Sequence, residues 1–251
     1  MQHPKVLLVE DEPIIAKDLC IYLDEWGYQV IETSATAEKA IEQADALKPN
    51  LILMDIKLKG RMDGIDAAVR IHERCNIPVV FLTAYLNDET IARAKQALPW
   101  GYLLKPCDPS TLRATLELAL NGFRKESELL KDRQLLLALM ETAPEFISFK
   151  DQEGRFIRIN RTLATFLDLK DPDEAQGKKD SDYFDPAYSL AVNEMELAVM
   201  RTGKPVIAAT ENMIRRNGQS IRILSSRWVL KDATGKPMGT FWISKDINDR
   251  F

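Results

Sequence analysis

The sequence predicts a doubly wound α/β unit with a five-stranded parallel sheet, then an α+β unit with an antiparallel sheet. Residues 1–122 alternate short apolar runs with amphipathic segments, whereas residues 143–251 hold strand-like runs around short helical segments. A long helical pattern lies between them. The length of 251 residues suits two ordinary domains, and 45% hydrophobic with 29% charged residues is typical of globular proteins. We therefore expect domains over 1–122 and 143–251, joined by a helical connector over 123–142.

The first half contains five apolar runs that read as strands, over 5–10, 28–33, 51–55, 78–83 and 101–104. These runs are nearly continuously apolar, as expected of strands covered on both faces. Helices are expected between them, over 13–26, 36–48, 64–75 and 87–97. Pro13 suits a first helical turn and Thr36 suits an N-cap.

A long helix is expected from Pro109 to about Thr142, just before Pro144. Its apolar residues recur at spacings of three and four, with Glu126 and Arg133 interrupting them. Two interpretations stay open. The helix either belongs simply to the first domain, or it continues as a coiled-coil-like connector through which the chain forms a homodimer.

The second half shows two short strands within 146–160 around a DQEG turn, helices over 161–168 and 186–202, and strands over 206–214, 220–230 and 238–247. By alternation, we assign to the core Phe146, Phe149, Phe156, Ile159, Phe166, Leu167, Phe184, Leu224, Trp228, Phe241 and Trp242. Arg222 or Arg227 can either meet a carboxylate ligand inside the fold or form surface salt bridges.

Charge and composition exclude several classes of function. The net charge is −4, with −5 in residues 1–122 and +1 in residues 143–251, which argues against a chain dominated by nucleic-acid binding. DNA remains a possible partner through the basic pairs Lys178–Lys179 and Arg215–Arg216. Only two histidines are present, which disfavours histidine-based catalysis.

The expected location is the cytoplasm, without membrane association. The sequence has no apolar run long enough to span a membrane, and its start lacks the apolar region of a signal peptide. The three cysteines lack CxxC spacing, which suits a reducing compartment.

Charged and polar residues follow the strands of the first half. Glu10 and Asp11 follow the first strand, Asp55 ends the third, Thr83 ends the fourth, and Lys105 follows the fifth. The carboxyl ends of parallel strands line one edge of a sheet, where ligands bind. Three converging carboxylates repel one another unless a cation lies among them, and oxygen ligands alone favour Mg²⁺.

Residues 1–122 resemble a response-regulator receiver domain, which has a flavodoxin-like fold. The matching motifs are VEDE, LILMD, MDG, FLTA and YLLKP. The resemblance implies that Asp55 accepts a phosphoryl group from a sensor histidine kinase, with Lys105 and Thr83 assisting. It implies that Mg²⁺ is bound by Glu10, Asp11, Asp55 and the backbone carbonyl of Lys57. It also implies a conformational switch made by Thr83 and Tyr102.

The loop after Asp55 departs from the common pattern of this family. It is one residue longer before Gly64, and Lys59 stands where proline is frequent. We expect the change to affect kinase docking or the orientation of the Lys57 carbonyl.

Residues 143–251 resemble a PAS domain, through FISFKDQEGRFIRIN, GKKDSDYF and FWISKDIND. The resemblance implies sensing of a small molecule or pairing with other proteins. This half has no histidine or cysteine, so a histidine-ligated haem and a flavin–cysteine adduct are excluded, and the ligand of the PAS domain remains unknown.

The expected function is therefore that of a response regulator in a two-component phosphorelay, acting through a downstream protein partner. The alternatives are a transcription regulator that binds DNA without a recognised DNA-binding domain, and a phosphate sink. No second nucleophile–base constellation is visible, so we expect no output enzyme in these residues.

Overall fold

The structure is a computed structural model that describes residues 3–85 and 88–248. The chain divides into two compact units, Met1–Leu130 and Lys131–Phe251. The division falls inside the long helix α5 (Pro109–Thr142). Across the described residues, no helix has the length and apolar character that crossing a membrane requires.

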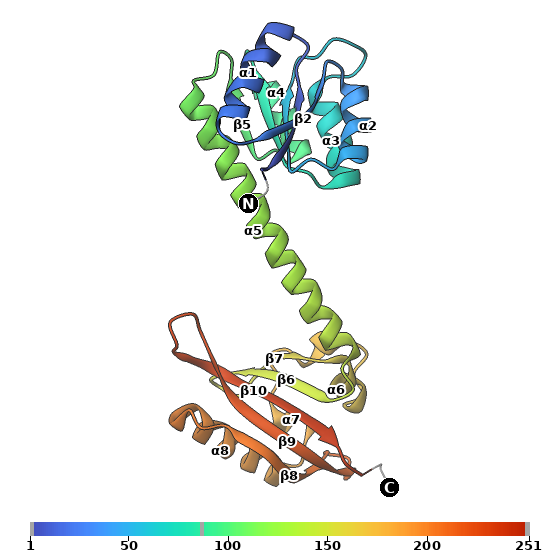
Figure 1. Ribbon diagram of the computed structural model, residues 1–251. Coiled ribbons are helices and arrows are strands. Elements are labelled where there is room, and N and C mark those ends of the chain that lie inside the picture. Colours follow the sequence, from blue (N-terminus) through green and yellow to red (C-terminus); the bar gives the residue numbers. More distant parts are fainter. Residues whose placement is uncertain (1–2, 86–87, 249–251) are drawn as a thin grey trace. The chain divides into compact units, whose positions relative to one another are not determined.

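The first unit contains a five-stranded parallel sheet in the order β2-β1-β3-β4-β5, which confirms the predicted fold class (Figure 1). Its strands are β1 (Lys5–Val9), β2 (Gln29–Ser34), β3 (Leu51–Asp55), β4 (Val79–Thr83) and β5 (Gly101–Leu104). Its helices before α5 are α1 (Pro13–Glu25), α2 (Ala37–Leu47), α3 (Gly64–Cys75), α4 (Asp88–Ala94) and the 3₁₀ turn η1 (Lys95–Ala97). Residue 87, the expected start of the fourth helix, lies outside the described residues.

Apolar packing on both faces of this sheet explains why its strands are continuously apolar. Every residue of β3 and β4 is buried. One core cluster packs the sheet against α2 and α3, and a second packs the other face against α1 and the start of α5. Burying each large aliphatic side chain contributes about 1.5–3 kcal/mol, so this core holds the strand ends in place.

Helix α5 changes character along its length. Its first turns bury Leu112, Leu116 and Ala119 against the sheet. Further along, it exposes a series of leucines: Leu129, Leu130, Leu135, Leu136, Leu137 and Leu139. The helix therefore continues to Thr142, as expected, with apolar residues that the described chain leaves in solvent.

The second unit has an antiparallel sheet in the order β7-β6-β10-β9-β8, again as predicted. Its strands are β6 (Phe146–Asp151), β7 (Phe156–Ile159), β8 (Val206–Ile214), β9 (Ser220–Lys231) and β10 (Pro237–Asp246). Its helices are α6 (Arg161–Phe166), η2 (Pro172–Ala175), α7 (Asp180–Tyr183) and α8 (Pro186–Thr202). The short η2 and α7 were not predicted, because their sequence is polar. Side-chain caps stabilise them, including Asp171 on η2.

The predicted core of this unit is wrong for Leu224, whereas Phe149 and Phe241 are partly buried and pack against a second core cluster of Met140, Ala143 and Ile147. Phe149, Trp228 and Phe241 stack together on a part-exposed face of the sheet, and Leu224 is 40% exposed. Phe241 lies directly opposite both Phe149 and Trp228 in the sheet, so the three rings must share one face. Trp242, the next residue, points to the buried face.

Candidate functional site

Glu10, Asp55, Thr83 and Lys105 lie at the carboxyl edge of the parallel sheet. The order β1-β3-β4-β5 brings the ends of these strands next to one another, with Asp55 ending a central strand. The first three residues are buried, each about 5% exposed or less. The fold therefore gathers the residues that the sequence singled out.

Lys105 is the central contact of this site. Its Nζ lies 2.5 Å from Oε2 of Glu10 and 2.6 Å from Oδ2 of Asp55. The backbone N–H of Lys57 donates to Oδ1 of Asp55 at 2.9 Å. The Lys105–Pro106 peptide is cis. Asp55 is thus held at both oxygens, by one ammonium group and one backbone amide.

Burial and charge shift two pKa values in this site. Burial is the main reason that the pKa of Glu10 is raised, and the nearby charge of Asp55 adds to it while Lys105 opposes it. For Lys105, burial alone would lower the pKa, but the contacts with Asp55 and Glu10 outweigh burial and raise it. Lys105 therefore remains a cation at neutral pH.

The acidic residues have the chemistry of a magnesium site. One oxygen from each of Glu10, Asp11 and Asp55 lies within 4.8 Å of the others. Two ammonium groups, those of Lys105 and Lys59, contact these three carboxylates. The Nζ atom of Lys59 lies 3.1 Å from Oδ2 of Asp11. An oxygen-only donor set with excess negative charge fits Mg²⁺. Ligation by the Lys57 carbonyl stays a prediction.

Gly64 fixes the end of β3 against the start of α3. Its N–H donates to the carbonyl of Ile56 at 2.9 Å. A Cβ atom at Gly64 would lie 1.9 Å from the carbonyl oxygen of Asp55, closer than any side chain permits. Glycine is therefore required for the helix to close on the strand that carries Asp55. The sequence motif MDG contains this residue, but its contact with Asp55 is visible only in the structure.

Thr83 and Tyr102 lie on neighbouring strands. The Thr83 hydroxyl donates to the carbonyl of Tyr85 at 2.8 Å, and a cavity of about 310 Å³ borders it. The Tyr102 ring lies 5.9 Å from that of Phe81. Its hydroxyl is buried and has no hydrogen-bond partner among the described residues. The free energy falls when such a hydroxyl moves to a new hydrogen-bond partner or to solvent.

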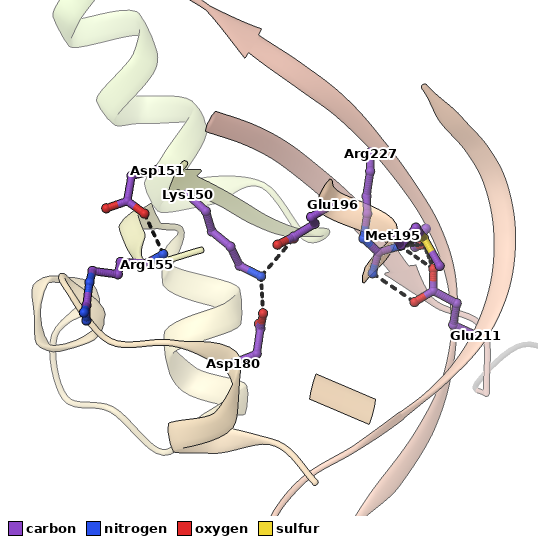
Figure 2. Close-up of polar contacts among 9 residues, drawn as sticks. Lys150, Asp151, Arg155, Asp180, Met195, Glu196, Glu211 and Arg227 are labelled. Atoms are coloured by element: carbon purple, nitrogen blue, oxygen red, sulfur yellow. Dashed lines mark hydrogen bonds and ion pairs between the residues drawn. The ribbon is translucent and has the colours of Figure 1, made fainter. Parts of the chain in front are cut away.

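The second unit contains charged residues that the sequence did not identify as buried. Lys150 contacts Asp180 and Glu196, and Arg227 pairs with Glu211 (Figure 2). The interpretation of Arg227 as a surface ion pair is wrong, because its side chain is only 1% exposed. Alternate residues of the strand FISFKD point to the same face of the sheet, so Lys150 lies on the buried face with Phe146 and Ser148. This alternation is the sequence signal that could have predicted the burial of Lys150.

The fold and the site define a signalling protein with an acidic receiver site and a separate α+β domain. The family model of the response regulator receiver domain matches residues 6–117, and that of the PAS fold matches residues 140–250. The chain belongs to the response regulators and carries a receiver domain and a PAS domain. Receiver domains of this family bind Mg²⁺ at an acidic site, and this chain has an acidic cluster of Glu10, Asp11 and Asp55.

Similar proteins include regulators from several bacteria. The transcriptional regulatory protein PdtaR of Mycobacterium tuberculosis is 38% identical over 138 residues, which cover 55% of this chain and 67% of that protein. The phyllosphere-induced regulator PhyR of Methylorubrum extorquens is 33% identical over 117 residues, 46% of this chain and 43% of PhyR. A signal receiver domain of a modulated diguanylate cyclase from Desulfovibrio desulfuricans G20 is 39% identical over 49% of this chain and 98% of that chain, with a TM-score of 0.48.

Proposed function

We propose that Asp55 accepts a phosphoryl group from a histidine of a partner sensor kinase and that this event changes how the chain assembles or binds a partner. The observation that carries the proposal is the setting of Asp55. Its carboxylate is buried, contacts Lys105 and lies beside Glu10 and Asp11. A nucleophile placed among metal-binding carboxylates and one fixed ammonium group suits phosphoryl transfer.

In the proposed step, an oxygen of Asp55 forms a bond to phosphorus while the phosphorus–nitrogen bond of the phosphohistidine breaks. The electron pair of that bond leaves with the imidazole nitrogen, which takes up a proton. Lys105 contacts a phosphoryl oxygen, and Thr83 donates its hydroxyl to another after leaving Tyr85. Glu10, Asp11, Asp55 and the carbonyl of Lys57 would hold Mg²⁺, which would neutralise negative charge between the carboxylates and the phosphoryl group.

The response to phosphorylation is proposed to begin with Thr83 and Tyr102. Movement of Thr83 towards the phosphoryl group opens space beside β4, and Tyr102 turns into it. The Tyr102 hydroxyl, which has no hydrogen-bond partner within 3–85 and 88–248, and the cavity beside Thr83 support this step. The surface formed by α4, β5 and α5 then changes shape, which is how a local charge change reaches a binding surface.

We propose functional boundaries at 1–122 for the receiver, 123–142 for the connector and 143–251 for the PAS domain. The exposed leucines of α5 support dimerisation through the connector. The output is a protein partner rather than an enzymatic activity. A second candidate output is control of transcription, which the name of the relative PdtaR favours.

The phosphoacceptor is tested by intact-mass measurement after incubation with acetyl phosphate and Mg²⁺. The wild-type chain should gain about 80 Da, the mass of one phosphoryl group. Asp55→Asn should not gain it, whereas Asp18→Asn, which removes an exposed carboxylate of the same unit, should gain it fully. An adduct that persists in Asp55→Asn would refute the assignment.

The output is tested by selecting genomic DNA fragments with the phosphorylated chain at physiological salt, with Asp55→Ala as the control. Discrete sites that are lost in the control would favour transcription control. No enrichment would favour a protein partner, which capture by the phosphorylated form alone would then identify.

A further inference from the structure

Three charged side chains meet at the centre of the PAS domain. Lys150 comes from β6, Asp180 from the start of α7 and Glu196 from α8. The ammonium group of Lys150 is hydrogen-bonded to Asp180 and lies 2.9 Å from Oε1 of Glu196 (Figure 2). None of the three side chains is more than 10% exposed. Phosphoryl transfer at Asp55 uses none of them.

The charges around this cluster do not balance. On β9, Arg227 donates through both terminal nitrogens to Glu211 of β8, and also contacts Ser225. On α8, burial raises the pKa of Tyr188, so this residue is neutral. Two cations, Lys150 and Arg227, therefore face three carboxylates when Asp180, Glu196 and Glu211 are all ionised. The interior then has a net charge of −1.

A net charge inside a protein is costly because water no longer solvates it. One proton on a carboxyl group removes this cost. Glu211 does not take up this proton. Burial opposes its ionisation, but the contacts with Arg227 outweigh burial and lower its pKa. Asp180 and Glu196 share a single ammonium group, and two carboxylates that share one site cannot both ionise easily.

Asp180 connects this cluster to the surface. It lines an inner cavity of about 10 Å³ together with Lys150, Glu196 and Ser148. It also lines an outer cleft of about 300 Å³ that includes Ser189, Asn193 and two charged residues, Glu153 and Lys179. The inner cavity is about the size that one water molecule needs, and the Ser148 hydroxyl has no partner among the described residues. A proton can therefore pass from the cleft to Asp180 and on to Glu196.

We propose that Asp180, Lys150 and Glu196 form a proton-binding site, in which the two carboxyl groups share one exchangeable proton. Hydronium in the outer cleft transfers its proton to a carboxylate oxygen and leaves as water. With the proton bound, the cluster together with Arg227 and Glu211 has no net charge. Without the proton, the same five side chains have a net charge of −1. When the proton is absent, the carboxylates of Asp180 and Glu196 repel each other around one ammonium group. This repulsion favours separation of α7 or α8 from β6. This inference does not depend on phosphorylation of Asp55.

The site is tested by carbon-13 NMR of the carboxyl carbons in the full chain, titrated from acid to mildly alkaline pH. Besides the signal of Glu10 in the receiver, one carboxyl signal should titrate above the ordinary glutamate value of about 4.3. Glu196→Gln, which imitates the protonated form, should remove this signal. Glu194→Gln, an exposed carboxylate on the same helix, should leave it unchanged.

Two results would overturn the proposal. The first is that every carboxyl signal of the wild-type PAS domain titrates at or below its ordinary value, because the cluster would then be permanently charged. The second is that the high titration persists in both Glu196→Gln and Asp180→Asn, because the proton would then lie elsewhere. The wild-type measurement decides the first question even if a variant fails to fold.

Discussion

The ammonium group of Lys59 lies 3.1 Å from a carboxylate oxygen of Asp11. The Lys59 side chain is 79% exposed, whereas that of Asp11 is 9% exposed, so a solvent-exposed cation contacts a proposed metal ligand. Lysine at this position is the departure noted in the sequence. We therefore expect Lys59 to compete with Mg²⁺ for Asp11.

Lys59→Gln should therefore bind Mg²⁺ more tightly. Exposed ion pairs contribute about 0.2–1 kcal/mol, which corresponds to a gain of up to about fivefold. Isothermal titration calorimetry of Mg²⁺ binding measures the effect directly. Arg61→Gln removes the same charge from an exposed position in the same loop and is the matched control. Equal gains in both variants would mean that overall charge, rather than the contact with Asp11, sets the affinity.

Lys105→Met should destabilise the receiver domain in the absence of Mg²⁺. It leaves Glu10 and Asp55 close together without a cation, and breaking a buried pair costs about 3 kcal/mol. Added Mg²⁺ should restore part of the loss by replacing the missing charge. Thermal unfolding with and without Mg²⁺ checks both statements, and an unchanged melting temperature would show that Lys105 does not stabilise this site.

The stability of the metal-free receiver should depend on pH through Glu10. Since folding raises the pKa of this carboxyl, the folded state binds its proton more tightly than the unfolded state. The stabilisation is complete below the ordinary pKa of about 4.5 and is lost as pH rises through the raised value. Glu10→Gln should abolish this part of the pH dependence in denaturant titrations. A wild-type profile that the substitution leaves unchanged would contradict the expectation.

Gly64→Ala should disrupt the phosphoacceptor strand. The added methyl group meets the Asp55 carbonyl, so the start of α3 must move away from β3. We expect a loss of about 3 kcal/mol in the unfolding free energy of the receiver and slower labelling of Asp55 by acetyl phosphate. Denaturant unfolding and intact-mass kinetics measure the two effects. Normal stability would mean that the helix moves at little cost.

The connector leucines should control dimerisation. Leu130 and Leu137 lie seven residues apart on one side of α5, and both are exposed. The double variant Leu130→Gln, Leu137→Gln should be monomeric by light scattering at concentrations where the wild-type chain is dimeric. Leu135→Gln changes a leucine on another side of the helix and should remain dimeric. A monomeric wild-type chain, with and without acetyl phosphate, would contradict the proposal.

The sequence predicted which residues meet at the edge of the parallel sheet, because each of them lies at or just after the end of a strand. Once LILMD is recognised as a buried strand, the position of Asp55 at the sheet edge follows from chain direction alone. The contact between Lys59 and Asp11 was not predictable, since it depends on how a loop folds back over a different strand. The Lys150 cluster was missed for a similar reason: its carboxylates come from two helices remote in sequence. In β9, apolar residues on both faces made Leu224 look like core.

Trp242 lies 5.7 Å from the guanidinium carbon of Arg227, measured from the centre of its ring. An indole beside a buried cation experiences a strong local electric field, and its emission wavelength responds to that field. The ring also borders the inner cavity next to Lys150 and Glu196. The PAS domain therefore contains a natural fluorophore at its centre. In a variant with phenylalanine in place of Trp26, Trp100 and Trp228, emission spectra recorded across pH should follow the charge of this interior.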